Sequence, residues 1–458
     1  MPAFSPEALA RWCGGRWTSP PPALCGVGTD TRTDLTGRLF IALRGERHDA
    51  HDHLEQAWAA GAAAAVVEAG RVTAAGGRPL LEVPDTRRAL SDLATGHRTA
   101  CPARFIGITG SAGKTTVKEL TADLLQTVGP AARTQGNWNN DIGLPLSLLA
   151  MDPAARFGVF ELGMNHPGEL APLCRILRHQ VGVVTTVGVA HAAFFPDVAA
   201  IAREKAEVLR ALPADGLAVV GADEPQRGLL TDGVRAHILT VSVGGQGDYT
   251  ARRLEGDRFE VTERASGDCI CFQAPVPGAF FVFDALLAVA VARHEGAAWA
   301  DLVAALAAYQ PLKLRGQVTV RDGIHFVNDA YNANPLSMRA SLSAFAERAV
   351  SGRRWLVLGG MGELGLHATN EHLAVGALAA RLGFDGLIAV GVLAQGMADG
   401  AASAGFRGAL HRCADPAAAA QMLHAYARAG DAVLLKGSRS ERVESVLAHW
   451  PGAGARAE

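Results

Sequence analysis

The fold is decided by the stretch Phe105-Ile-Gly-Ile-Thr-Gly-Ser-Ala-Gly-Lys-Thr-Thr116. Its apolar start is typical of a buried strand, and a glycine turn then leads into a helix-forming segment that continues to Leu125. In this layout the glycines let backbone N–H groups point at phosphate oxygens, and the helix N-terminus adds partial positive charge. Lys114 supplies a full charge, and Thr115 Oγ can reach a phosphate-bound Mg²⁺. The stretch therefore predicts a phosphate-binding loop.

This loop differs from the common type. The usual spacing requires glycine at position 108, where Ile108 stands, and the turn starts at Gly110 to give Gly-x-x-Gly-Lys-Thr. The alternative is an ordinary strand-to-helix turn rich in small residues. Lys114, Thr115 and Thr116 in register behind the glycines favour the phosphate loop.

Composition limits the classes of protein to consider. The chain has 458 residues, of which 49% are hydrophobic and 19% charged, so it is globular and long enough for several cores. A net charge of −2 argues against nucleic acid as the main ligand. Since the sequence lacks an apolar run of about 20 residues, we expect no membrane insertion.

The termini and cysteines bear on the compartment. The N-terminal residues, Met1-Pro-Ala-Phe-Ser-Pro6, lack the basic-then-apolar order of a signal peptide. Seven scattered cysteines fit a reducing cytoplasm, and Cys269-Ile-Cys271 is interpreted as packing or exposed strand residues, not metal ligands. We expect a cytoplasmic protein and a monomer, although no feature of the sequence determines the oligomeric state.

Three α/β blocks follow one another, which predicts a small N-terminal α/β domain over 1–101, a central doubly wound, phosphate-loop ATPase-like domain over 102–311 and a C-terminal Rossmann-like α/β domain over 312–458. Near-continuous apolar strands with helices between them indicate parallel sheets covered on both faces. The expected strands include 38–43, 63–68, 79–84, 157–162, 181–187, 325–329, 355–359, 386–390 and 432–436, and the expected helices 52–61, 86–97, 197–212, 285–294 and 416–428.

Polar residues after the central strands are candidates for a metal site. Glu161 lies near the end of a buried strand, and His191 follows the next strand, at the sheet edge where ligands collect in open α/β sheets. A buried carboxylate is costly unless it meets a cation. The alternative makes Glu161 a capping residue and His191 a loop residue, but their matching positions favour a shared site.

Two further features are open to a structural interpretation. Lys205 lies in a helical stretch beside Glu204, and composition alone predicts a surface lysine. The amide-rich segment 135–143 contains Asn139 and Asn140, which either bind amide and carboxylate groups of a ligand or form a turn cluster.

In the third block, loops flanking a strand carry Arg315, Tyr331 and Asn332. Arg315 is suited to stabilise charge on a transferring phosphoryl group. The sequence Lys436-Gly-Ser-Arg439 ends the last strong strand with two cations and a hydroxyl, a set that suits an anionic group such as a carboxylate.

Together these pieces resemble the Mur ligase family over nearly the whole chain. No single motif is decisive, but their order and spacing are specific. The residues that carry the resemblance are 29–32, 39–45 with His51 and Asp52, 109–116, 136–145, 161–166, His191, Lys205, 329–335, 361–365 and 436–440. The family uses the shortened phosphate loop.

The resemblance implies an ATP-dependent amide ligase that joins D-alanyl-D-alanine to UDP-MurNAc-tripeptide through an acyl phosphate. It implies that the first domain holds the UDP end near Thr31 and Arg32, and that Asn139 and Asn140 face the peptidyl substrate. It further implies these roles: Gly110, Ser111, Ala112, Gly113, Lys114, Thr115 and Thr116 around the ATP phosphates; Thr115, Glu161, His191 and a carbamylated Lys205 at Mg²⁺; Arg315, Tyr331 and Asn332 closing over ATP; and Lys436, Ser438 and Arg439 placing the dipeptide. Lys114, His191, Lys205 and Arg315 would be catalytic.

The sequence departs from the family pattern at two places, neither of which involves the expected phosphate or metal residues. Relatives carry His-Asn where Phe280 and Phe281 stand, which leaves adenine recognition open, and Gly359-Gly-Met361 replaces the common Gly-Asp-Met.

Two functions are alternatives to this ligase. One is a related ligase with another acid or amine, such as a folylpolyglutamate-type enzyme, and the other is a nucleotide-switch protein that hydrolyses ATP to change shape.

Overall fold

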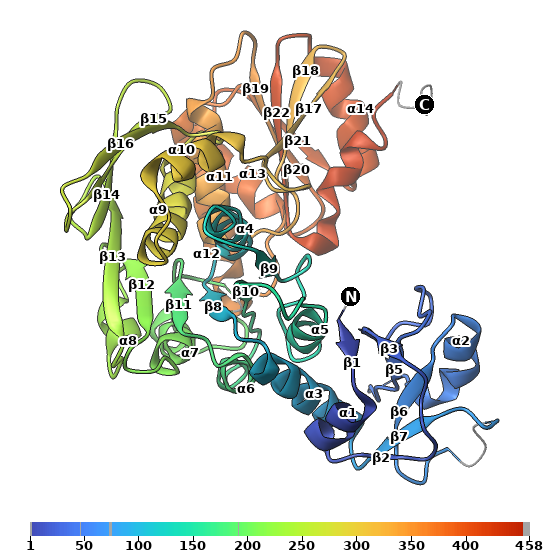
Figure 1. Ribbon diagram of the computed structural model, residues 1–458. Helices are drawn as coiled ribbons and strands as arrows, with labels where there is room; N and C mark the ends of the chain where they lie inside the picture. Colours follow the sequence, from blue (N-terminus) through green and yellow to red (C-terminus); the bar gives the residue numbers. More distant parts are fainter. Residues whose placement is uncertain (1, 46, 73–75, 191, 452–458) are drawn as a thin grey trace.

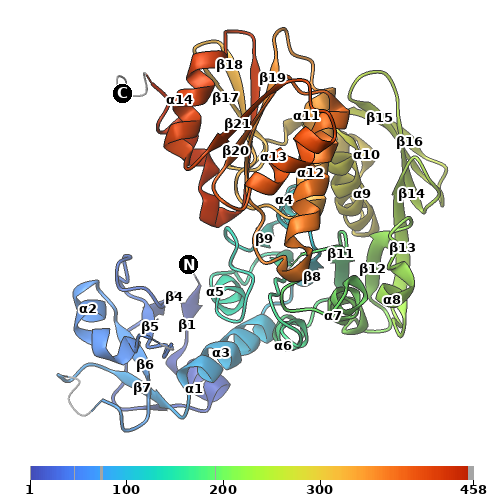
Figure 2. The same ribbon diagram turned by 180° about the vertical axis from the view of Figure 1, so that it is seen from behind.

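The computed structural model describes residues 2–45, 47–72, 76–190 and 192–451, and it contains three α/β units arranged in chain order (Figure 1). The N-terminal unit stands to one side of the central unit, and the C-terminal unit lies against the central unit in both views (Figure 2). The predicted fold class is confirmed. The expected boundaries at 101/102 and 311/312 fall in the connections between elements, and they stay a proposal.

The N-terminal unit is built on a five-stranded sheet of order β2-β7-β6-β5-β4. Its longest element is the helix α3, which leads into the central unit. Asp85 caps this helix, since its side chain accepts a hydrogen bond from Arg88 N at 2.8 Å. The elements are β1 Ala3–Phe4, α1 Pro6–Cys13, β2 Arg16–Trp17, β3 Leu24–Cys25, β4 Val27–Gly28, β5 Leu39–Ile41, η1 Ala50–His53, α2 Leu54–Ala59, β6 Ala64–Glu68, β7 Leu80–Val83 and α3 Thr86–Ala100.

The central unit is a nine-stranded sheet of order β16-β15-β14-β13-β12-β11-β8-β10-β9. It is parallel from β9 to β14 and antiparallel over the last two pairs. The elements are β8 Arg104–Thr109, α4 Lys114–Leu125, β9 Ala131–Arg133, α5 Gly143–Leu149, β10 Phe157–Glu161, α6 Leu170–Leu177, β11 Val181–Val184, α7 Val198–Arg210, β12 Leu217–Gly221, α8 Arg227–Thr231, β13 His237–Val243, β14 Tyr249–Arg253, β15 Arg258–Glu263, β16 Cys269–Gln273, α9 Ala279–His294 and α10 Trp299–Ala308.

Helices cover both faces of this sheet, which is why its inner strands read as continuous apolar runs. In β8, Phe105 belongs to the core beneath α6 and α7, whereas Ile106 and Ile108 belong to the core beneath α4 and α9. Ile108 is thus a fully buried strand residue and not part of the glycine turn.

The C-terminal unit is a six-stranded sheet of order β17-β18-β22-β19-β20-β21. Only the edge strand β17 is antiparallel to its neighbour. The elements are β17 Gln317–Arg321, β18 Ile324–Asn328, α11 Pro335–Glu347, β19 Arg354–Gly359, η2 Gly365–His367, α12 Ala368–Leu382, β20 Gly386–Val390, α13 Gln395–Ser403, β21 Ala409–Cys413, α14 Pro416–Tyr426, β22 Ala432–Lys436, η3 Arg439–Glu441 and η4 Val443–Leu447.

The structure differs from the sequence analysis in the bounds of one helix and in the number of strands. Helix α9 begins at Ala279, six residues before the predicted Ala285. Its first turns bury Phe281 and Val282, so the apolar run before Ala285 belongs to the same helix. The strands β1, β2, β3, β4, β9, β12, β17 and β21 were not among those expected. Within the described residues, no helix is both long and apolar enough to cross a lipid bilayer.

Candidate active site

Two glycines shape the turn between β8 and α4. Gly110 has φ 155° and Gly113 has φ 84°, which are backbone conformations that favour glycine. A Cβ atom at position 110 would lie 1.8 Å from Thr185 Oγ1, and one at position 113 would lie 2.5 Å from Asp284 Oδ1. The fold therefore needs glycine at these two positions, and it leaves the first N–H groups of α4 facing the turn.

Lys114 lies across this loop. Its Nζ donates a hydrogen bond to Gly110 O at 2.8 Å. Burial lowers the pKa of Lys114, with Glu161 opposing this shift and Arg315 reinforcing it. A partly buried ammonium group with a nearby carboxylate and a second cation is poised for an anion of high charge.

Glu161 links the loop to the amide-rich segment. It is the last residue of β10 and is 2% exposed. Thr115 Oγ1 donates to Glu161 Oε2 at 2.7 Å, and Asn139 Nδ2 donates to Glu161 Oε1 at 2.7 Å. Carboxylate and hydroxyl oxygens in contact are the ligand types that Mg²⁺ prefers, so this donor set fits a magnesium ion. His191, the other expected metal ligand, lies outside the described residues.

Lys205 is 2% exposed, so the prediction of a surface lysine from composition is wrong. It lies on the buried stripe of α7, between Ile201 and Val208, and this helical spacing was the signal that composition missed. Burial lowers the pKa of Lys205 well below its ordinary value, Lys114 reinforces the shift and Glu204 opposes it. The hydrogen bonds of the Glu204 carboxylate go to the backbone: it accepts from the N–H groups of Gly168 and Leu170, at 2.9 and 3.0 Å.

The C-terminal unit brings Arg315 to the phosphate loop. The Arg315 guanidinium lies over the Tyr331 ring, 4.1 Å from its centroid, and influences the pKa of both Lys114 and Asp284. Burial raises the pKa of Tyr331. Arg315 and Tyr331 thus lie near the carboxyl edge of the central sheet, where β8, β10 and β11 end.

Other predicted residues are already engaged within their own units. Lys436 Nζ donates to Asp329 Oδ2 at 2.7 Å and to Asn332 O at 3.3 Å, so it fixes the loop that carries Asn332. Ser438 Oγ lies 3.0 Å from Ser440 Oγ, and Arg439 pairs with Glu444 at 2.6 Å.

The remaining predicted residues lie in two places. Asn140 Oδ1 accepts hydrogen bonds from Ile142 N and Gly143 N at the start of α5, at 3.3 and 2.8 Å. Thr31 and Arg32 lie in the N-terminal unit, where Arg32 is exposed and its guanidinium donates two hydrogen bonds to Asp30, at 2.9 and 2.7 Å. The structure does not bring Thr31 or Arg32 to the phosphate loop.

Sequence reasoning missed Asp284. It lies on α9 with Oδ1 beside Gly113, and burial raises the pKa of its carboxyl well above the ordinary value while Arg315 opposes this shift. A single carboxylate inside the apolar run Phe280–Ala292 was the available signal. Of the two phenylalanines at the start of α9, Phe280 is 45% exposed and Phe281 is buried against Tyr309.

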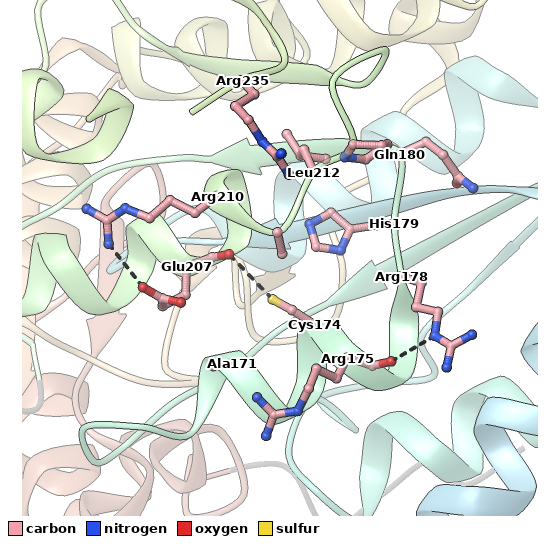
Figure 3. Close-up of a pocket in the computed structure, with 12 residues that line it drawn as sticks. Ala171, Cys174, Arg175, Arg178, His179, Gln180, Glu207, Arg210, Leu212 and Arg235 are labelled. Carbon is pink, nitrogen blue, oxygen red and sulfur yellow. Dashed lines mark hydrogen bonds and ion pairs between the residues drawn. The ribbon is translucent and has the colours of Figure 1, made fainter. Parts of the chain in front are cut away.

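A cavity of about 630 Å³ lies at the other edge of the central sheet, the amino edge, where β11 and β12 begin. Figure 3 shows it between α6 and α7, with the guanidinium groups of four arginines apart from one another around it. The arginines are Arg175, Arg178, Arg210 and Arg235, and the lining also includes Cys174, His179 and Glu207. This cavity contains none of the predicted site residues.

Two family models match parts of the chain. Residues 108–292 match the Mur ligase middle domain, and residues 314–439 match the Mur ligase, glutamate ligase domain. The UDP-N-acetylmuramoyl-tripeptide–D-alanyl-D-alanine ligase of Escherichia coli is 36% identical over 382 residues, which cover 80% of this chain and 81% of the relative.

Solved structures extend the likeness over the whole chain. A crystal structure of MurF from Acinetobacter baumannii superposes with a TM-score of 0.88 at 30% identity and covers 98% of each chain. MurF ligase from Thermotoga maritima in complex with ADP gives a TM-score of 0.81 at 26% identity, over 93% of this chain and 97% of that one.

Proposed function

The chain belongs to the Mur ligase family, and from this membership we propose that it joins D-alanyl-D-alanine to UDP-N-acetylmuramoyl-tripeptide at the expense of ATP. The observation that carries the proposal is the cluster at the carboxyl edge of the central sheet. There, a phosphate loop, a buried Thr115–Glu161 pair, the buried Lys205 and Arg315 of the next unit lie together. The relatives that carry this activity in their names match most of the chain at 30% identity or more.

The reaction needs activation because a carboxylate does not acylate an amine in water. The terminal carboxylate of the tripeptide attacks the γ-phosphorus of ATP, which forms an acyl phosphate and releases ADP. The amine of D-alanyl-D-alanine then attacks the acyl carbon, the tetrahedral oxyanion expels phosphate, and the amine loses a proton. The sum is acid plus amine plus ATP giving amide, ADP and phosphate.

The phosphate loop and its neighbours would hold the transferring group. The loop 110–116 would surround the phosphates, the free N–H groups at the start of α4, from Gly113 to Thr116, would bind phosphate oxygens, and Lys114 would leave Gly110 O to neutralise charge. Arg315 would stabilise the charge that spreads over the γ-phosphoryl oxygens, with Tyr331 holding its guanidinium plane.

Thr115 and Glu161 would hold Mg²⁺, with His191 as a further ligand. When bound, this ion neutralises phosphate charge and polarises the oxygens of the group under transfer. Asn139 would orient the Glu161 carboxylate through the hydrogen bond to Oε1.

Lys205 would act as a carbamate. A lysine amine attacks CO₂ only in its neutral form, so the lowered pKa of Lys205 favours this modification. The N–C bond forms with loss of one proton, and the product is an anion with carboxylate-like oxygens. This change would place an anion beside Lys114 in place of the amine, and its oxygens would serve as further ligands for a metal ion.

The substrates would reach this edge from opposite units. The UDP end would bind the N-terminal unit near Thr31 and Arg32, and Asn140 would contact the peptidyl part. Lys436 would act indirectly, by fixing the 329–332 loop, while Ser438 and Arg439 would contact the dipeptide. Phe280, which is exposed at the start of α9, would lie near the base of ATP.

An acceptor screen tests this proposal. ADP release is measured with ATP, Mg²⁺ and each substrate alone or together, and the product is identified by its mass. The proposal expects ADP release only when UDP-MurNAc-tripeptide and D-alanyl-D-alanine are both present, with the pentapeptide as product. ATP hydrolysis that is indifferent to both would favour a nucleotide switch, and turnover with another acid or amine would favour a related ligase.

A further inference from the structure

The N-terminus of α11 rests directly on the phosphate loop of the central unit. Asn334 Nδ2 donates a hydrogen bond to Ser111 O at 2.9 Å, a contact between residues 223 positions apart. The same side chain caps its own helix, because Asn334 Oδ1 accepts a hydrogen bond from Ser337 N at 2.9 Å. The backbone N–H of Asn334 in turn donates to Ser337 Oγ at 3.0 Å. Each half of one carboxamide therefore serves a different unit of the protein.

Ser111 is held firmly on its other sides. Its N–H donates to Thr186 O at 2.7 Å, and its Oγ donates to Gly188 O at 3.1 Å. The next N–H, of Ala112, faces Thr186 Oγ1 at 3.3 Å. Because the peptide unit is planar, the Ser111 carbonyl and the Ala112 N–H point in opposite directions and move as one body. Asn334 and Thr186 thus fix one rigid peptide plane of the loop between them.

A second contact of the same helix end reaches the segment that follows β11. A Cβ atom at Gly188 would lie only 2.5 Å from Leu336 Cδ1, so Leu336 packs against the backbone there. Ser111 and Gly188 are themselves joined by hydrogen bonds through the Ser111 hydroxyl. The first turn of α11 therefore contacts two linked loops at the carboxyl edge.

We propose that Asn334 is a positioning residue that couples docking of the C-terminal unit to the shape of the phosphate loop. Docking supplies the Ser111 carbonyl with a fixed amide donor, and this contact holds the Ser111–Ala112 plane in the conformation that the loop needs for phosphate. This coupling rests on the proposed ligase function only where it is tested by kcat and KM. The amide reaches the loop backbone and not a substrate, so Asn334 acts through Ser111.

The test separates the two halves of the carboxamide. Asn334→Asp keeps an oxygen that caps Ser337 N but replaces the donor with an anion facing a carbonyl. Asn334→Ser keeps the cap and is too short to reach Ser111. Ser337→Ala is the matched control, because it removes the reciprocal part of the capping box and leaves the Asn334–Ser111 contact in place.

Losing one neutral hydrogen bond in the closed arrangement predicts a fall in kcat of about fivefold for Asn334→Ser, and a larger fall for Asn334→Asp. We expect the KM for ATP to change less than kcat, since the contact completes only when the units dock. The Ser337→Ala control should lower thermal stability and keep the wild-type kcat. Wild-type kcat in both Asn334 variants, or an equal loss in the control, would overturn the proposal.

A second measurement does not depend on the substrates. Small-angle scattering with and without ADP reports compaction, which we expect to weaken in the Asn334 variants and to persist in Ser337→Ala. Unchanged compaction in the Asn334 variants would contradict the coupling. If the wild type lacks the ligase reaction but shows this pattern of compaction, the proposed function fails while the coupling stands.

Discussion

The two edges of the central sheet differ in what their charged groups do. At the carboxyl edge, Lys114, Glu161 and Lys205 are partly or fully buried, and they come from three different elements, α4, β10 and α7. At the amino edge, Arg175, Arg178 and Arg235 line an open cavity and are exposed to solvent. The cavity of about 630 Å³ is at the edge that lacks the predicted chemistry.

This contrast teaches that desolvated charge locates a site better than empty volume. A buried ion is retained only where partners or a ligand compensate its loss of hydration, whereas an exposed arginine costs little and carries little information. In α/β sheets the carboxyl edge also collects helix N-termini, which favour anions. The predictions below test whether function follows the buried charge, from the largest expected effect to the smallest.

Lys114→Ala should have the largest effect. The variant removes the only lysine of the loop that faces the phosphate position, so we expect ligase turnover to fall by about a thousandfold or more. ADP release with both substrates measures the effect, and thermal denaturation checks that the fold is kept. Full activity in this variant would remove the assignment of the phosphate loop.

Lys205→Ala should lower kcat by about a hundredfold, because the proposed carbamate would be lost as a ligand of the metal ion. Short carboxylic acids that fit the space left by the side chain should restore part of the activity. Lys118→Ala is the matched control, since Lys118 is a second fully buried lysine whose Nζ donates to Thr134 O at 2.8 Å and to Gly136 O at 3.3 Å. Acids should not rescue that control, and full activity of Lys205→Ala would contradict the carbamate.

The carboxyl edge was predictable from sequence as far as local signals reach. The apolar run up to Thr109, the glycines at 110 and 113 and the lysine behind them are contiguous, so the strand, turn and helix could be predicted together. Glu161 could be found because it ends an apolar strand. These signals act over a few residues and need no knowledge of packing.

Other features depend on contacts between distant segments. Asp284 meets Gly113 only because α9 packs on α4, and Asn334 meets Ser111 only when two units dock. Composition made Lys205 a surface residue, although its place on the apolar stripe of α7 pointed inward. The strand β12 was missed although all five of its residues, Leu217–Gly221, are buried.

At the amino edge we expect His179 to affect stability and not catalysis. His179 is 1% exposed, its Nε2 lies 2.7 Å from Val208 O, and its Nδ1 has no hydrogen-bond partner among the described residues. Burial lowers the pKa of His179 from 6.5 to about 4. The unfolded chain therefore binds the proton more tightly, and stability is lost as the pH falls from about 6.5 toward 4.

This shift predicts that His179 lowers the free energy of unfolding by about 2 kcal/mol between pH 7 and pH 5. Urea denaturation at the two pH values measures it, and His179→Gln should lose this part of the pH dependence while the carboxylates continue to titrate. An equal pH dependence in the variant would show that His179 is not buried as a neutral ring. A hundredfold loss of turnover at pH 7 in a folded His179→Gln variant would contradict the division between the edges.

The smallest effect is expected at the exposed arginines. Arg175 and Arg178 flank the cavity, and the Arg178 Nε donates to Arg175 O at 3.3 Å. Replacing both with alanine removes two exposed charges far along the sheet from the phosphate loop, so kcat/KM should change by less than about twofold at physiological ionic strength. The steady-state rate at saturating and limiting ATP measures this. A loss of activity of more than tenfold in a folded double variant would show that charge at the amino edge affects the reaction. Burial of charged groups would then no longer distinguish the functional edge of the sheet from the other edge.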